Sequence, residues 1–140
     1  IDEIGDGDEK KAIETVEKWR QKLGEVFEGK FKIQNSKFEI QNSILLAWED
    51  LLKNYKIPRK LPLELIEGVL MDTHTKRYET FEELYVYCYR VASTVGLMSS
   101  EILGYSDKIA LEYAEAMGIG MQLTNILRDI KEDAAMDRIY

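Results

Sequence analysis

Apolar residues recur along this chain at the spacing of helices with one buried face. Between residues 8 and 28 they return every three or four positions, with charged residues between them. This period is typical of an amphipathic helix, whereas the apolar residues of a half-buried strand alternate. The positions are Ala12, Ile13, Val16, Trp19, Leu23, Val26 and Phe27. Gly29 follows directly, and glycine is well suited to end a helix because it accepts a left-handed backbone conformation.

The same pattern predicts four more helices. They are expected over residues 44–55, about 62–71, 80–103 and about 107–134. Thr80 and Glu83 have the spacing of a capping box, in which each side chain accepts a hydrogen bond from the first turn. The helix that they begin is apolar on nearly every side, so we expect it to be central and buried. The pattern therefore predicts an all-α fold.

Residues 30–43 interrupt this helical pattern with a tandem repeat. KFKIQNS is followed at once by KFEIQNS, which is identical at six of seven positions. Phe and Ile alternate in each copy as in a short strand, and Asn-Ser ends each copy as in a turn. We therefore predict a loop or hairpin insertion, since surface loops accept insertions readily. A binding arm or a dimer contact is the alternative interpretation.

Composition places the chain among soluble globular proteins and excludes some functions. It has 140 residues, 45% of them hydrophobic and 32% charged, and its net charge is −7. An acidic chain is not expected to bind nucleic acid. The single cysteine, Cys88, excludes an intrachain disulfide and a cysteine-based metal site, and its apolar neighbours predict a buried thiol. This usage of cysteine suits the cytoplasm.

The last predicted helix carries the strongest chemical signal. Gln122, Asn125, Asp129 and Asp133 follow one another at steps of three, four and four residues within an otherwise apolar segment. At about 100° per residue they form one polar stripe. Gly118 lies one turn earlier on the same face, where it is expected to leave room for a ligand. Because buried polar groups need partners, the stripe predicts a metal ion, water or substrate beside it.

A second pair of carboxylates stands near the beginning of the chain. Asp2 and Asp6 are four residues apart, as are Asp129 and Asp133. On a helix such carboxylates share one face, about 6 Å apart along the axis. Two such pairs facing each other would suit Mg²⁺, which binds one or two carboxylates together with phosphate oxygens of a substrate.

Each of these signals also has a purely structural interpretation. The stripe could be the solvated edge of an amphipathic helix, and the first pair could be an acidic helix start. Tyr87 could be a core residue. Arg128 and Arg77 are candidates for binding a carboxylate or a diphosphate, although such arginines are more often plain surface charges. The only histidine, His74, is expected to be exposed.

Three stretches of the chain resemble a known family. They are IDEIGD, LMDTHTKRYETFEELYVYCYRVASTVGLM and GIGMQLTNILRDIKEDAAMDRIY. They resemble the head-to-head prenyl synthases, which comprise squalene, dehydrosqualene and phytoene synthases. Their sequences are most similar to those of the bacterial phytoene synthases. The resemblance covers most of the chain outside 30–43. It implies an isoprenoid-synthase-type helical bundle, of which residues 1–140 would form a single partial domain from the centre.

The resemblance also implies roles for individual residues. Asp2 and Asp6 match the first Asp-rich motif of the family. The second motif is matched by Asp129 and Asp133, with Asn125 and Gln122 before it. In the family, Mg²⁺, or Mn²⁺ in its place, bridges these motifs to prenyl diphosphates. Tyr87 matches the active-site tyrosine, and Asp72 and Arg128 match further positions on the side of the diphosphate or the metal.

The resemblance implies a reaction that joins two allylic diphosphates through a cyclopropyl diphosphate. Two geranylgeranyl diphosphates giving phytoene, in carotenoid biosynthesis, is the expected case. The alternatives are a squalene or dehydrosqualene synthase that uses farnesyl diphosphate, and a non-catalytic helical domain that binds a prenyl diphosphate. The greasy products imply loose contact with a membrane surface, although the sequence shows no anchor. Nothing in the sequence indicates an oligomeric state.

The chain departs from the family pattern in several places. Gly5 stands where the family usually has an aliphatic residue, and Ser93 and Asp137 each stand where it usually has glycine. The repeat over residues 30–43 is foreign to the family. Full members are longer, and their additional helices would enclose the cavity. We therefore expect the chain to be a piece of a longer enzyme, and the isolated piece to be inactive or nearly so.

Overall fold

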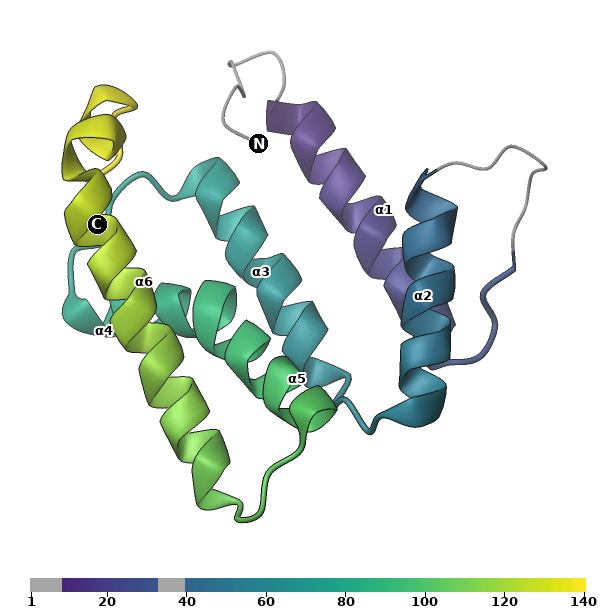
Figure 1. Cartoon of the computed structure of the whole chain (residues 1–140). Coiled ribbons are helices and arrows are strands. Elements are labelled where there is room, and N and C mark those ends of the chain that lie inside the picture. The colour runs from purple at the N-terminus through teal and green to yellow at the C-terminus, as the bar shows by residue number, and fades with distance from the viewer. Residues whose placement is uncertain (1–8, 33–39) are drawn as a thin grey trace. The chain divides into compact units, whose positions relative to one another are not determined.

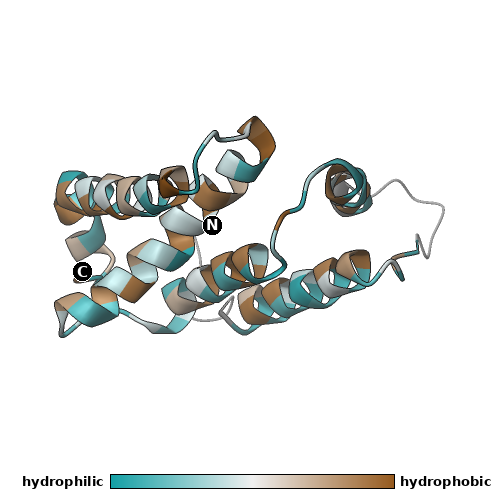
Figure 2. Cartoon of the chain, turned by 90° about the horizontal axis from the view of Figure 1, so that it is seen from below, coloured by the Kyte–Doolittle hydropathy of each residue, from teal (hydrophilic) through white to brown (hydrophobic). Residues whose placement is uncertain are grey.

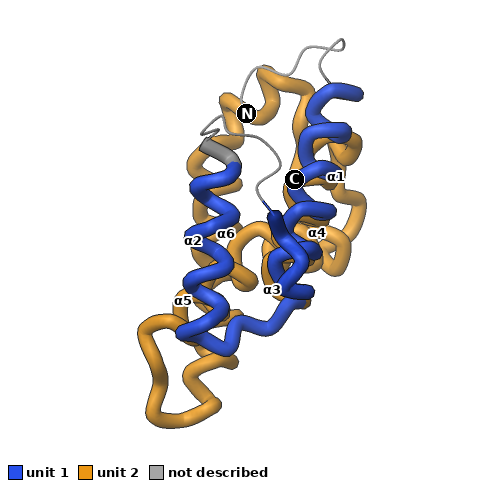
Figure 3. The backbone as a smooth tube through the Cα atoms, turned by 90° about the vertical axis from the view of Figure 1, so that its right-hand side faces the viewer, with its two compact units in different colours: residues 1–59 blue, residues 60–140 orange. Residues whose placement is uncertain are grey.

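The computed structural model describes residues 9–32 and 40–140, and they divide into two compact units. The first unit spans residues 1–59 and the second spans residues 60–140 (Figure 3). Each unit has its own helices and its own buried residues, so each is described by itself. Asp2, Asp6 and Gly5 lie outside the described residues.

The first unit is a pair of helices, α1 (Glu9–Phe27) and α2 (Ile40–Asn54) (Figure 1). They pack through buried apolar residues that the sequence pattern places on one face of each helix: Leu23, Val26 and Leu45. The rings of Phe27 and Trp48 extend this contact, with centroids 6.4 Å apart. Gly29, two residues after the end of α1, has a φ of 65°, which confirms the predicted helix stop.

The helix α2 begins earlier than the sequence predicted. It starts at Ile40, so the loop or hairpin predicted over 30–43 is wrong for residues 40–43. Residues 33–39, which end the first copy of the repeat and begin the second, lie outside the described residues. Ile40 stands four positions before Ile44 in the sequence, so the apolar period of α2 already runs back into the second copy of the repeat.

The second unit contains the remaining helices (Figure 1). They are α3 (Lys60–His74), α4 (Phe81–Cys88), the π-helical segment η1 (Tyr89–Ser93), α5 (Thr94–Leu103) and α6 (Ile109–Ala135). The helix predicted over 80–103 is thus a succession of α4, η1 and α5. The Thr80 half of the capping box is present, because the Glu83 amide donates to Thr80 Oγ1 at 3.2 Å. The Glu83 carboxylate accepts instead from the amide of Glu79, one residue before Thr80, at 2.9 Å.

The middle of this succession is buried, but its outer positions are not. Cys88, Ser93 and Thr94 have no exposed surface, and η1 contacts α3, α4, α5 and α6. In contrast, Phe81 is 58% exposed and Val86 is 45% exposed. The expectation of burial on nearly every side is therefore wrong for α4, because the packed helices of this unit cover only one side of it.

Two glycines allow the closest helix contacts in the second unit. A Cβ atom on Gly118 would lie 2.5 Å from Ser93 Cα, and one on Gly96 would lie 3.1 Å from the Ala114 carbonyl oxygen. The Ser93 hydroxyl donates to the Glu115 carbonyl at 2.7 Å. The expected room for a ligand at Gly118 is therefore absent, because the backbone of η1 occupies it.

The two faces of α6 differ in burial. Gly118 and Ile119 are buried, while Tyr113, Met117 and Leu127 are about two-thirds exposed, at 66%, 67% and 70%. Figure 2 shows hydrophobic residues in bands along the helices of this unit. None of the helices in the described part of the chain combines the length and apolarity that crossing a bilayer requires.

We predict that Gly118→Ala destabilises the protein whereas Gly120→Ala does not. The added methyl group at Gly118 would meet the Ser93 backbone, whereas a Cβ atom on Gly120 would meet nothing within 4 Å. Overpacking of this kind costs about 1–3 kcal/mol. Replacing a helical glycine by alanine without a clash stabilises by about 1 kcal/mol. Urea unfolding measures both, and equal stability of the two variants would contradict the contact.

Candidate active site

The predicted polar stripe lies on the half-buried side of α6. Gln122, Asn125, Asp129 and Asp133 are all half-buried, and they continue the face on which Gly118 is buried. Leu127 lies on the other face and is 70% exposed. The stripe is therefore part of the inner face of the helix rather than its fully solvated edge.

Asp129 is held by its sequence neighbour Arg128. The guanidinium donates to both carboxylate oxygens, with Nε–Oδ1 and Nη2–Oδ2 distances of 2.6 and 2.5 Å. This hydrogen bonding lowers the pKa of Asp129 and raises the pKa of Arg128. The Asp129 carboxylate is therefore ionised at neutral pH, and Arg128, whose side chain is 68% exposed, is its partner.

Asp133 has a different environment one turn later. Burial raises its pKa, the charges of Asp129 and Glu132 raise it further, and Arg138 opposes them. Within residues 9–32 and 40–140 no three acidic, histidine or cysteine side chains form a group that could hold a metal ion. The second Asp-rich motif by itself therefore supplies only part of a coordination shell, and Asp2 and Asp6 lie outside the described residues.

Tyr87 lies at the centre of a second cluster, next to the π segment. It is 4% exposed and packs with Cys88 and Ile119 in the core. The ring centroids of Tyr78 and Tyr140 lie 5.2 and 5.4 Å from that of Tyr87. Pairs of aromatic rings at such distances attract each other beyond their simple burial. This environment is compatible with Tyr87 as a core residue and as an active-site tyrosine, because a residue with a buried ring can still present its hydroxyl to a site.

Asp72 of α3 is the polar partner of Tyr87. The Tyr87 hydroxyl lies near enough to the Asp72 carboxylate for hydrogen bonding between them to shift the pKa of both groups. Burial raises the pKa of Asp72, while the hydrogen bond and the charge of Arg138 lower it and Asp133 raises it. Burial, with the charge of Asp72, also raises the pKa of Tyr87, so this phenol stays protonated. Because the charge of Asp133 reaches Asp72, the polar stripe lies within electrostatic range of the tyrosine cluster.

The segment after α6 brings Tyr140 to this site. Ile139 forms a parallel bridge with Arg77, in which the Ile139 amide donates to the Lys76 carbonyl at 2.8 Å and the Tyr78 amide donates to the Ile139 carbonyl at 3.1 Å. Asp137 makes the required turn with a φ of 60°. A residue there must adopt a left-handed conformation, which explains why the family pattern has glycine and why aspartate is tolerated.

The remaining candidate residues lie in different environments, some exposed and some buried. Arg77 lies on the surface, where its Nε atom is 2.8 Å from a carboxylate oxygen of Glu79. His74 is exposed and Cys88 is buried, as the sequence predicted. Sequence reasoning did not single out Tyr78 and Tyr140, because neither falls on a helical period. The only available signal was that both stand within the stretches that resemble the family.

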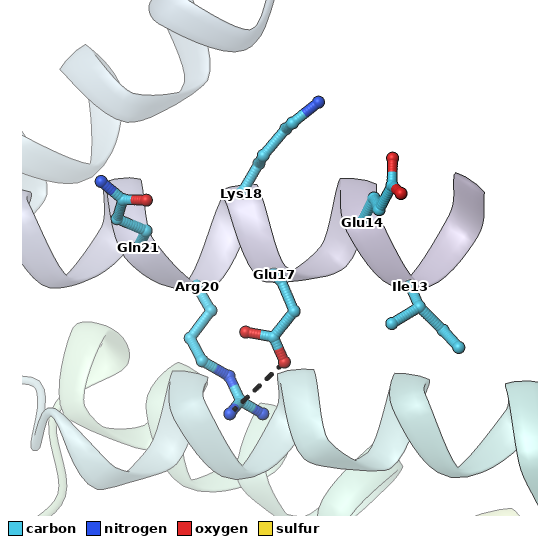
Figure 4. Close-up of a pocket in the computed structure, with 6 residues that line it drawn as sticks. All are labelled: Ile13, Glu14, Glu17, Lys18, Arg20 and Gln21. Atoms are coloured by element: carbon cyan, nitrogen blue, oxygen red, sulfur yellow. Dashed lines mark ion pairs between the residues drawn. The ribbon is translucent and has the colours of Figure 1, made fainter. Parts of the chain in front are cut away.

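A hollow in the first unit contains none of the predicted residues. It measures about 470 Å³ and is lined by side chains of α1 (Figure 4). Glu17 and Arg20 point toward each other there, with 3.6 Å between Oε1 and Nη1. About two turns of a single helix with an ion pair on them offer no catalytic arrangement, so the candidate site is the cluster of the second unit.

We predict that Asp72→Asn stabilises the protein at neutral pH. Because burial raises the folded-state pKa of Asp72 above its ordinary value of 3.8, the folded state binds the proton more tightly than the unfolded state. Stability from this group is therefore present at low pH and lost as the pH rises through the folded-state pKa. Asparagine avoids this loss and still accepts from Tyr87. Urea midpoints at about pH 4 and pH 7, with Asp50→Asn in α2 as the exposed control, measure the effect. A lower midpoint than wild type at pH 7 would contradict it.

Comparison with known proteins places this site in a family. The squalene/phytoene synthase family matches residues 1–140. The chain is 38% identical over 153 residues to the 15-cis-phytoene synthase of Synechocystis, covering 99% of this chain and 43% of that protein. It is 39% identical over 147 residues to phytoene synthase 1 of Solanum lycopersicum, covering 99% and 34%.

A solved structure has the same fold. The squalene synthase HpnC from Alicyclobacillus acidocaldarius matches with a TM-score of 0.80 and 24% identity, over 100% of this chain and 48% of that one. This match confirms the predicted all-α fold. The chain spans less than half the length of the relatives cited here. With the family match over residues 1–140, these similarities show that the chain belongs to the squalene/phytoene synthase family.

Proposed function

We propose that the protein carrying this chain condenses two prenyl diphosphates head to head, and that it makes phytoene from two geranylgeranyl diphosphates by way of a cyclopropyl diphosphate. The similarity to proteins named phytoene synthase, at 38% and 39% identity, supports this product. The observation that carries the proposal is the buried Tyr87–Asp72 pair beside the polar stripe of α6. The chemistry of that arrangement is suited to an allylic carbocation.

The oxygen ligands of the stripe fit Mg²⁺, and they fit Mn²⁺ similarly. Asn125, Asp129 and Asp133 offer an amide and two carboxylates on one face of α6, and hard cations prefer such oxygens. These residues would hold the metal together with Asp2 and Asp6. When bound, the metal neutralises the charge of the departing diphosphate. Arg128, with Gln122, would contact the same diphosphate, and Arg77 is a further candidate.

The tyrosine cluster would serve the hydrocarbon part of the reaction. Tyr78, Tyr87 and Tyr140 present aromatic faces in a buried place, and aromatic faces attract cations. Burial also excludes water, which would otherwise trap a carbocation as an alcohol. Burial raises the pKa of Tyr87, so its hydroxyl remains protonated, and the rings of Tyr78 and Tyr140 pack against its own ring.

A second candidate is squalene or dehydrosqualene synthesis from farnesyl diphosphate. The similarity of fold to the squalene synthase HpnC favours it, at a TM-score of 0.80. The two candidates differ in the length of the prenyl chain, which depends on the depth of the cavity. In either case we propose a cytoplasmic enzyme that contacts a membrane surface only peripherally, since its product is a hydrocarbon.

The test is product analysis of the longest natural polypeptide that carries this chain. It is incubated with geranylgeranyl or farnesyl diphosphate and Mg²⁺, next to its Asp129→Asn variant and an Asp50→Asn control. We expect a C40 hydrocarbon from the unsubstituted protein and the control. Asp129→Asn should lower the rate about a hundredfold or more. The substitution removes one carboxylate ligand of the metal that would neutralise the departing diphosphate.

The other outcomes separate the alternatives. A C30 product from farnesyl diphosphate alone would establish the squalene-type reaction instead. No product from either substrate, with binding of the diphosphates unaffected by Asp129→Asn, would favour the non-catalytic helical domain. The isolated 140-residue chain is expected to give little or no product, and efficient turnover by it would contradict the prediction that the cavity needs further helices.

A further inference from the structure

The helix α3 comes closest to the π segment at Gly68. A Cβ atom on this buried glycine would lie 2.9 Å from Arg90 Cβ and 2.7 Å from Val91 Cγ1. No side chain therefore separates the two helices here, and the side chain of Arg90 begins directly against the surface of α3. Glu64 stands four residues before the glycine and Met71 three residues after it, so both lie on the same face of α3.

The guanidinium of Arg90 bonds to α3 on both sides of this glycine. Its Nε atom donates to Glu64 Oε2 at 2.9 Å, and its Nη1 atom donates to the thioether sulfur of Met71 at 3.4 Å. The side chains of Arg90 and Glu64 are only 29% and 24% exposed. A guanidinium carries its donors in one rigid plane, so it can bind two turns of a helix at once. We call the contacts of Arg90 with Glu64 and Met71 the α3 clamp.

The backbone of Arg90 is held by Thr94, which is fully buried. The Thr94 amide donates to the carbonyl of Tyr89, five residues earlier, which is the hydrogen bond of a π turn. The Thr94 hydroxyl donates to the Arg90 carbonyl at 2.7 Å. The α3 clamp therefore starts from a hydrogen-bonded turn in the interior of the unit.

Both ends of the α3 clamp adjoin groups of the candidate site. Met71 packs against the buried core cluster that contains Tyr87, and Asp72 is the next residue of α3. Tyr87 lies in the last turn of α4, three residues before Arg90. A shift of α3 along η1 would therefore move Asp72 relative to Tyr87.

We propose that Arg90 is a positioning residue of this site, and that its guanidinium sets the register of α3 on η1. The placement of Asp72 beside Tyr87 depends on that register. A partly buried ion pair recovers little more than its own cost of desolvation, but its directed bonds favour one arrangement of the two helices. The catalytic meaning of the proposal rests on the proposed function, whereas the α3 clamp rests on the contacts alone.

The structural test is NMR of the longest natural polypeptide that carries this chain, with ¹³C-labelled methionine methyl groups. Met71→Leu assigns the Met71 resonance. We expect Glu64→Gln to shift this resonance, although Glu64 lies seven residues away, about 10 Å along α3, because the change reaches Met71 through Arg90. In an Arg90→Leu background, Glu64→Gln should no longer shift it.

Two results of this experiment would overturn the proposal. One is a Met71 resonance that Glu64→Gln leaves unchanged, and the other is an equal shift with and without Arg90. The first result decides the matter even if Arg90→Leu fails to fold, because Glu64→Gln keeps the size of the side chain and removes only its charge.

The kinetic test measures kcat and KM for product formation by the same polypeptide. We expect Arg90→Leu to lower kcat by about ten- to a hundredfold with KM nearly unchanged, as for misplaced groups of a site. Arg90→Lys keeps a positive charge for Glu64 and should recover part of that loss. The matched control is Arg59→Leu, which breaks an exposed ion pair of the first unit and should leave kcat unchanged.

The remaining outcomes separate positioning from other roles. A higher KM with unchanged kcat in Arg90→Leu would show that Arg90 binds the diphosphate itself, and would overturn the positioning role. Equal kcat values per folded protein, in Arg90→Leu and the unsubstituted protein, would overturn it as well, since the ion pair would then serve stability alone. If the unsubstituted protein forms no product, the proposed function fails while the Met71 resonance still decides the α3 clamp.

Discussion

The arrangement of the second unit depends on the contact between the π segment and α6. All four α-helices of the unit contact η1, and η1 meets α6 where Gly118 has no side chain. Protein interiors are close-packed, so such a contact restricts how the two helices can pack against each other. The extra residue of the π turn places Tyr87 and Cys88, which precede the segment, and Ser93, its last residue, against the same inner face. The tyrosine cluster and the polar stripe meet because this contact aligns them.

This alignment carries a cost in stability. Asp72 and Asp133 are acids whose pKa values burial raises, and the Tyr78 hydroxyl is buried without a partner in the described part of the chain. A core built only for stability would place apolar groups at such positions. Clusters of perturbed groups are typical of functional sites, although ion-pair networks also produce them. Here Asp72 and Asp133 are positions that the family resemblance had already indicated, which strengthens the functional interpretation of these two groups.

Two departures from the family pattern have physical explanations in this fold. Ser93 replaces a glycine, and its hydroxyl finds the Glu115 carbonyl at 2.7 Å, so the added side chain is satisfied in a fully buried place. Asp137 replaces a glycine at a φ of 60°, a conformation that aspartate adopts more readily than most residues. Both positions adjoin the site, and both retain its geometry. The exposed apolar face of α6, with Leu127 at 70%, is in keeping with a chain that spans less than half of its relatives.

The sequence by itself determined the helices, the capping box at Thr80 and the polar stripe of α6, because each depends on spacing within one element. It also indicated Asp72 and Tyr87 through the family resemblance. It could not place Tyr78 and Tyr140 beside Tyr87, nor show that Gly118 receives the backbone of Ser93 and leaves no room for a ligand. Those contacts join elements that are distant along the chain. Only tertiary packing decides them, since local periodicity says which face of a helix is buried but not what covers it.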